Sequence, residues 1–235
     1  MDEQEKIINE SIEYARANKK RLARELTDIK KFPPDEEPVA VFMSGSPGAG
    51  KTEASQRLIE RFSPHGSGVL RIDSDELRKY FSTYDGTNSS LFQSATSIIA
   101  DKVQDLAIQQ HQSYVFDGTL SNLDRARENI TRCLKHGYSV HIIYVYQDPL
   151  QAWKFVKARE VRDGRAVPKQ AFIDQYFKAR QSVNQLKKEF GSQLELHLIV
   201  KNIDGSDFKY EDNISQVDSY VPELYTEIKL QEQIG

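Results

Sequence analysis

The chain has 235 residues, and its 32 Lys and Arg against 35 Asp and Glu leave a formal net charge of −3. This length fits one compact domain with a small appendage, and 11 Tyr and 11 Phe provide the core residues that disordered or collagen-like chains lack. A slightly acidic chain lacks the broad basic surface of a typical nucleic-acid-binding protein, which argues against a nucleic-acid partner but leaves room for a local basic groove.

The single cysteine, Cys133, excludes an intramolecular disulfide and a thiolate-rich zinc site, so we expect a reducing, cytoplasmic setting. No stretch approaches the ~20 apolar residues that span a bilayer, so we expect no membrane association. None of the histidines shows H-x-H or H-E-x-x-H spacing, so the sequence does not predict a histidine-built metal site. These histidines are His65, His111, His136, His141 and His197.

Apolar residues recur at helical spacing near the N-terminus, including Ile12, Ala15 and Leu22, and predict an amphipathic helix from residue 2 to about residue 30. Pro33-Pro34 and the acidic run after it break this periodicity. We therefore divide the chain into an N-terminal helix and linker, residues 1–37, and a main domain, residues 38–235.

Short apolar runs alternate with helical patterns along the main domain. The runs cover residues 39–43, 68–72, 114–116, 140–146 and 194–200. This alternation predicts a central parallel β-sheet flanked by helices, an α/β fold. Helix starts are expected at Ser121, with Asp124 three residues later, and at Asp148 before Pro149. Beyond residue 206 we expect one strand and a final helix.

A complete G-x-x-x-x-G-K-[ST] motif follows the first predicted strand directly and leads into a helical run. It reads Gly45, Ser46, Pro47, Gly48, Ala49, Gly50, Lys51 and Thr52. Such a loop wraps its backbone N–H groups around a phosphate, aided by the positive end of the following helix. Lys51 would reach the β and γ phosphates, and Thr52 offers a hydroxyl to Mg²⁺. The sequence thus predicts a P-loop nucleotide site.

Two carboxylates follow the second predicted strand, Asp73 and Asp75. Ligands of open α/β sheets bind at the edge where the strands end. A carboxylate there can accept the proton of a substrate hydroxyl that attacks the γ-phosphorus, so we expect a phosphotransferase with Asp75 as the base. Asp73 is either a second substrate contact or a helix cap.

The third predicted strand ends at Asp117, followed by Gly118 and Thr119. Asp117 is expected to position Mg²⁺ through water or to bind substrate, and the sequence does not separate these roles. Farther on, Arg159, Arg162 and Arg165 lie close together at a helix end. Planar guanidinium groups on a mobile lid would neutralise the transferring phosphate, for which we favour Arg159 and Arg165.

These pieces resemble the zeta-toxin family of P-loop kinases over roughly residues 38–200. The resemblance implies that Lys51 and Thr52 bind ATP and Mg²⁺, that Asp75 deprotonates the sugar of UDP-N-acetylglucosamine, and that Asp117 and Thr119 hold it. It further implies that Arg159 and Arg165 stabilise the transferring phosphate. A small helical antitoxin commonly restrains such toxins, and the amphipathic N-terminal helix is an alternative source of restraint.

The chain departs from the family pattern on the substrate side, with Asp117 where Glu is common. The loop between Arg159 and Arg165 is short, so Arg162 is an alternative first phosphate clamp. Asp75 and Arg78 also match the D-x-x-R of polynucleotide 5′-hydroxyl kinases, in which Arg78 would contact the acceptor's phosphate. Other small-molecule kinases share the scaffold. A non-enzymatic ATP-binding switch would need neither the base nor the arginine cluster.

Overall fold

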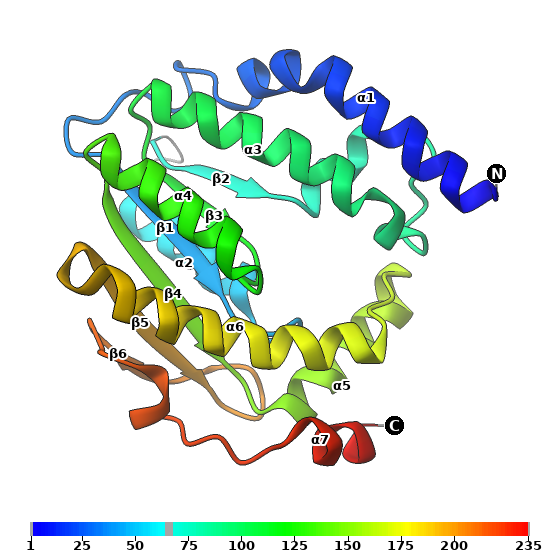
Figure 1. Cartoon of the computed structure of the whole chain (residues 1–235), viewed down its shortest axis with the longest axis vertical. Helices are drawn as coiled ribbons and strands as arrows, with labels where there is room; N and C mark the ends of the chain where they lie inside the picture. Colours follow the sequence, from blue (N-terminus) through cyan, green and yellow to red (C-terminus); the bar gives the residue numbers. More distant parts are fainter. Residues whose placement is uncertain (1, 64–67, 235) are drawn as a thin grey trace.

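The computed structural model describes residues 2–63 and 68–234, and His65 lies outside these ranges. Within them the chain forms a six-stranded sheet in the order β2-β3-β1-β4-β5-β6 (Figure 1). The strands are β1 (Val39–Ser44), β2 (Leu70–Asp73), β3 (Tyr114–Asp117), β4 (Ser139–Tyr146), β5 (Leu194–Lys201) and β6 (Asp207–Glu211). The first five strands pair in parallel and β6 runs antiparallel to β5, which confirms the expected α/β fold.

Helices connect the strands and cover both faces of the sheet (Figure 1). The α-helices are α1 (Glu3–Leu26), α2 (Lys51–Phe62), α3 (Gln93–Gln109), α4 (Leu123–Lys135), α5 (Pro149–Asp163), α6 (Lys169–Phe190) and α7 (Glu227–Gln233). Short 3₁₀ helices are η1 (Glu76–Tyr80), η2 (Ser89–Phe92), η3 (Gly191–Gln193) and η4 (Val217–Ser219). The strand and helix expected beyond residue 206 are β6 and α7.

The two faces of the sheet have separate cores because successive residues of a strand point to opposite sides. Phe42 of β1 and Ile142 of β4 belong to the core that includes buried residues of α1, α3, α4 and α6. Their neighbours Met43 and Ile143 pack on the other face with Ala54 of α2. The nearly continuous apolar runs in the sequence reflect this burial on both faces.

The predicted N-terminal helix is present as α1 and ends at Leu26, a few residues earlier than expected. Thr27 follows it, and its hydroxyl donates a hydrogen bond to the Ala23 carbonyl at 2.8 Å. Helix α1 lies along α3 in Figure 1, and its buried Ala15 and Leu22 belong to the same core as the sheet. The apolar stripe read from the sequence is therefore the surface that docks α1 on its own domain.

One predicted helix start is confirmed, and the other lies one residue later than predicted. Asp148 caps α5 as expected, since its carboxylate accepts hydrogen bonds from the backbone N–H groups of Leu150 and Gln151. Helix α4 is instead capped by Asn122, whose side chain accepts from the Arg125 N–H. Ser121 does not cap α4 because its hydroxyl is engaged with Thr119 in the preceding turn.

Strand β1 lies between β3 and β4, so the chain leaves it toward one side of the sheet and returns on the other. Ligands of open α/β sheets bind beside such a reversal, at the carboxyl ends of the strands. Among residues 2–63 and 68–234, no helix has both the length and the apolar character that a bilayer crossing requires.

Candidate active site

The loop between β1 and α2 is pressed so closely against β4 and α5 that two of its positions admit only glycine. A Cβ on Gly45, at φ 137°, would lie 2.4 Å from the Val145 carbonyl oxygen. A Cβ on Gly48, at φ 75°, would lie 2.3 Å from the carbonyl oxygen of Ala152. The two glycines therefore allow the loop to adopt positive φ angles and to pack directly against the backbone of β4 and α5.

Lys51 begins α2 and turns back over this loop. Its ammonium donates hydrogen bonds to the Gly45 carbonyl at 3.0 Å and to the Ser46 carbonyl at 2.7 Å. Burial lowers the pKa of Lys51, and attraction to Asp117 and Asp75 opposes that shift. The lysine charge thus lies within electrostatic reach of both carboxylates selected from the sequence.

Asp75 lies two residues after the end of β2 and contacts three arginines from two parts of the chain. Arg78, three residues on, places Nη1 2.5 Å from Oδ1. Arg165 forms an ion pair with Oδ2 through Nη1, and Arg159 Nη2 lies 3.6 Å from the same oxygen. Arg159 is on α5, and Arg165 follows the left-handed Gly164 that ends this helix. The end of α5 is thereby brought to the end of β2.

The basic residues near the end of α5 do not all converge; they are Lys157, Arg159, Arg162 and Arg165. Arg162 is three-quarters exposed and pairs with its neighbour Asp163 through Nε and Nη2. Lys157 pairs with Glu160 at 2.5 Å. Arg159 is therefore the arginine that accompanies Arg165 at Asp75, and Arg162 points elsewhere.

A second cluster joins the ends of β2 and β3 around Arg71. Asp73 and Asp117 are paired in register on these strands. Arg71 Nη2 lies 2.6 Å from Asp73 Oδ2 and 2.7 Å from Asp117 Oδ2, and its Nη1 pairs with Glu76. Burial, together with repulsion from Asp75 and Asp117, raises the pKa of Asp73 to about 6.

Asp73 also organises the turn that carries Asp75. Its Oδ1 accepts the Asp75 backbone N–H at 2.8 Å, so it acts as a cap of this turn as well as a partner of Arg71. Asp117 is nearly fully buried and also lies 3.1 Å from the Ser55 hydroxyl of α2. Asp73 is thus held by Arg71 and by the turn after β2, and Asp117 by Arg71 and by the helix after the P-loop.

Thr119 supports the P-loop mainly through its backbone. Its carbonyl accepts the Ser44 hydroxyl at 3.0 Å and the Gly45 N–H at 3.4 Å, while its own hydroxyl pairs with Ser121. Leu120 beside it has φ 57°, a left-handed conformation that costs a branched residue energy. The loop after β3 therefore braces the phosphate loop.

Sequence reasoning missed Arg71 and Lys201. Arg71 is two residues before Asp73 in a strand, and alternate residues of a strand point to the same face. This spacing could have predicted that Arg71 lies beside Asp73. Lys201, at the end of β5, is almost fully buried and pairs with Asp207 at 2.6 Å. Its Cε would lie 3.1 Å from a Cβ on Gly50, so its stem packs against the P-loop.

The residues present fit a nucleotide and a divalent cation. Gly45 and Gly48 let the loop pack directly on β4 and α5, and Lys51 supplies a buried positive charge beside it. Such a loop at a helix N-terminus presents backbone N–H groups to a phosphate. Thr52 in the first turn of α2 and Asp117 offer the oxygen ligands that Mg²⁺ prefers.

Known proteins share this fold over most of the chain. The toxin–antitoxin system PezAT of Streptococcus pneumoniae superposes with TM-score 0.61 at 16% identity, covering 94% of this chain and 86% of that chain. The AvrRxo1-ORF1:-ORF2 complex with ATP superposes with TM-score 0.58 at 16% identity, covering 86% and 65%. The Pnkp1/Rnl/Hen1 RNA repair complex gives TM-score 0.50 at 15% identity, covering 80% and 52%.

No curated protein matches the sequence. The family model described as Zeta toxin matches residues 23–215, a span from the end of α1 to beyond β6 that includes the P-loop, Asp75 and both converging arginines. The chain therefore belongs to the zeta toxin family of P-loop kinases.

Proposed function

We propose that the protein transfers the γ-phosphate of ATP to a hydroxyl of UDP-N-acetylglucosamine, with Asp75 as the base. The observation that carries the proposal is the contact of Asp75 with Arg78, Arg159 and Arg165 at the sheet edge that holds the P-loop. A nucleotide-binding switch needs the loop but has no use for a carboxylate and two lid arginines beside it. The ATP-containing complex among the structural neighbours supports ATP as donor.

The arginine contacts indicate how the base becomes available. Asp75 Oδ2 is engaged by Arg165 and Arg159, while Oδ1 is engaged by Arg78. The triphosphate of ATP carries more negative charge than one carboxylate, so Arg165 and Arg159 would move to the γ-phosphate when it binds. Oδ2 is then free to accept the proton of an acceptor hydroxyl.

The transfer follows from these positions. Asp75 takes the hydroxyl proton as the acceptor oxygen forms a bond to the γ-phosphorus, and the bond between that phosphorus and the β–γ bridging oxygen breaks to leave ADP. Lys51 shifts from the Gly45 and Ser46 carbonyls to the β and γ phosphates, and the two arginines neutralise the equatorial oxygens. Mg²⁺, held by Thr52 and through water by Asp117, would supply further charge neutralisation.

The acceptor would bind beside Asp73, Asp117 and Thr119. Arg78 is buried and pairs with Asp75 through Nη1, so its positive charge lies beside the proposed base, where a phosphate of the UDP group would be attracted. A polynucleotide 5′-hydroxyl kinase would use the Asp75–Arg78 pair in the same way. The two acceptors differ in the binding surface they need, because a polynucleotide strand requires an extended, positively charged groove.

The experiment is an acceptor panel. The purified chain is incubated with Mg²⁺ and ATP and with UDP-N-acetylglucosamine, other UDP-sugars, nucleosides and 5′-hydroxyl oligonucleotides, and products are read by mass spectrometry. A phosphoryl gain on UDP-N-acetylglucosamine supports the proposal. A gain on another acceptor alone keeps the kinase mechanism and replaces the substrate, and ATP binding with no gain on any acceptor favours the switch.

A further inference from the structure

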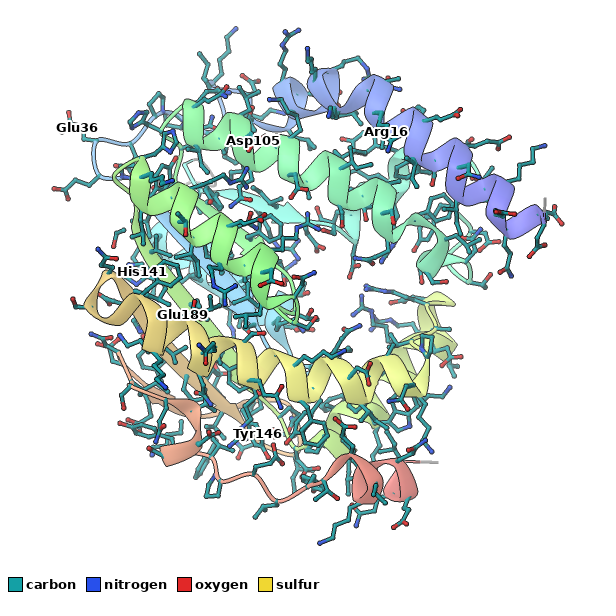
Figure 2. The ribbon with its side chains drawn as sticks, in the orientation of Figure 1. Arg16, Glu36, Asp105, His141, Tyr146 and Glu189 are labelled. Carbon is teal, nitrogen blue, oxygen red and sulfur yellow. The ribbon has the colours of Figure 1, made fainter. Side chains whose placement is uncertain are left out.

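Two histidines and a glutamate meet on β4 and β5, away from the candidate active site. His141 is the third residue of β4, and Glu195 and His197 lie near the start of β5. His141 is paired in register with Glu195, and the period of two puts His197 on the same face. In Figure 2 the labels of His141 and Tyr146 mark opposite ends of β4, and the P-loop lies toward the Tyr146 end, because Ser44 pairs with Tyr144.

One atom from each of the three side chains contributes to a small triangle. His141 Nδ1 and His197 Nε2 are 3.0 Å apart. Glu195 Oε2 lies 3.5 Å from His141 Nδ1 and 3.6 Å from His197 Nε2. Zn²⁺ binds such atoms at about 2.0–2.2 Å in a tetrahedron, which places any two ligands about 3.4 Å apart. The triangle already has the size of one face of a zinc tetrahedron.

The other ring nitrogens are held by the partners that metal-binding histidines usually have. His197 Nδ1 lies 2.7 Å from Asp212 Oδ1, and His141 Nε2 lies 3.0 Å from the Ser139 hydroxyl. A carboxylate at Nδ1 keeps the proton on that nitrogen and leaves the Nε2 lone pair of His197 facing the triangle. Tyr210 donates to the same Asp212 oxygen at 3.1 Å and stacks on the His197 ring, which fixes both.

The three side chains of the triangle do not fully satisfy one another by hydrogen bonds. The two histidines can share one proton, but the Glu195 oxygen is 3.5 Å or more from both nitrogens, longer than an ordinary N–H···O bond. A cation at the centre would engage all three atoms together.

We propose that His141, Glu195 and His197 form a tetrahedral Zn²⁺ site completed by a water molecule. Imidazole nitrogen and carboxylate oxygen are the donor set that suits zinc, whereas Mg²⁺ prefers oxygen ligands alone. Glu195 is 44% exposed, so the ion enters from solvent and keeps a position open to water. Bound zinc would tie β4 to β5 and, through Asp212, to the segment after β6. This inference is independent of the phosphoryl-transfer proposal.

The test uses the full chain, freed of metal by chelation and titrated with zinc against a chromophoric chelator. We expect one zinc ion per chain with a dissociation constant in the micromolar range or below, and a thermal midpoint that rises with zinc. Co²⁺ in place of zinc should show the visible absorption of a tetrahedral site. Glu195→Gln, an exposed change of nearly equal shape, and His141→Asn should each weaken binding at least tenfold.

His136→Asn is the matched control, because His136 is exposed at the end of α4 and its Nδ1 lies 2.8 Å from the Arg132 carbonyl of that helix. It should bind zinc as the unaltered chain does. If His141→Asn does not fold, Glu195→Gln decides the outcome. Absence of stoichiometric zinc binding by the unaltered chain, or undiminished binding by Glu195→Gln, would overturn the proposal.

Discussion

Arg165 forms an ion pair with Asp75, and this contact joins the segment after α5 to the end of β2. The two residues are far apart in the sequence and belong to different connections of the sheet. Arg159 contacts the same carboxylate oxygen, so two cations and one carboxylate meet beside the phosphate loop. In the proposed reaction, these arginines would leave the carboxylate for the γ-phosphate, so nucleotide binding would release Asp75 to act as the base.

Replacing Arg165 with alanine should lower kcat at least 10²-fold, because a guanidinium that neutralises the transferring phosphate acts mainly in the transition state. The KM for ATP should change much less. Steady-state kinetics of ATP consumption with the identified acceptor give both values. A variant with unchanged kcat and a raised KM for ATP would mean that Arg165 binds ground-state nucleotide only.

Arg159 and Arg162 can be told apart by parallel alanine substitutions. Arg159 reaches the Asp75 carboxylate, whereas Arg162 is exposed and paired with Asp163. We expect Arg159→Ala to lose at least tenfold more of kcat than Arg162→Ala, measured in the same transfer assay. The reverse order would make Arg162 the first phosphate clamp.

The glycine at position 48 should not tolerate alanine. Gly48 and Gly137 have nearly the same φ, 75° and 76°, but a Cβ at 48 meets the Ala152 carbonyl while a Cβ at 137 meets nothing within 4 Å. Gly137→Ala therefore carries only the backbone strain, about 1 kcal/mol, and should keep ATP affinity. Gly48→Ala should cost clearly more in urea unfolding and lose ATP binding by calorimetry. Equal effects of the two changes would contradict a tightly packed loop.

Asp73 should make stability depend on pH. Its pKa is raised from 3.8 to about 6 in the folded protein, so the folded state holds this proton more tightly than the unfolded chain does. The contribution to stability is fully present below pH 3.8 and is lost as the pH rises through 6. Asparagine cannot ionise, so Asp73→Asn avoids this loss of stability at high pH. At pH 8 the substitution should raise the free energy of unfolding by up to about 3 kcal/mol.

The measurement is urea unfolding of both proteins between pH 4 and pH 8. The advantage of Asp73→Asn should shrink as the pH falls. A difference that is constant with pH, or that favours the unaltered protein at pH 8, would show that Arg71 holds Asp73 ionised at no net cost.

Much of the fold could be predicted because strands buried on both faces leave continuous apolar runs, and parallel strands bring their ends to one edge. Asp117 directly follows such a run and Asp75 lies three residues beyond one, which is why the sequence predicts both carboxylates at this edge. The start of α4 was misplaced because Ser121 and Asn122 are both capping residues, and only the contact of Ser121 with Thr119 decides between them. Local pattern does not contain that contact.

Contacts between residues far apart in the chain could not be predicted from the sequence for the same reason. Arg159 and Arg162 have the same charge and nearly the same position, and only the direction of α5 relative to β2 separates them. His141 and His197 are 56 residues apart, so no local spacing could reveal that the register of β4 and β5 brings them together. Arg71 was overlooked because an arginine in a strand is usually a surface residue, whereas here it neutralises two carboxylates.

The central claim is that Asp75 is the base of a phosphoryl transfer from ATP to UDP-N-acetylglucosamine. Single-turnover reactions with the unaltered chain, Asp75→Asn and the control Asp174→Asn on the exposed face of α6 test it, with ATP affinity measured alongside. We predict phosphorylated UDP-N-acetylglucosamine from the unaltered chain and the control, and a rate ~10²-fold or more lower from Asp75→Asn with ATP affinity retained. Transfer by Asp75→Asn at the unaltered rate, or ATP binding by the unaltered chain without any sugar product, would contradict the account.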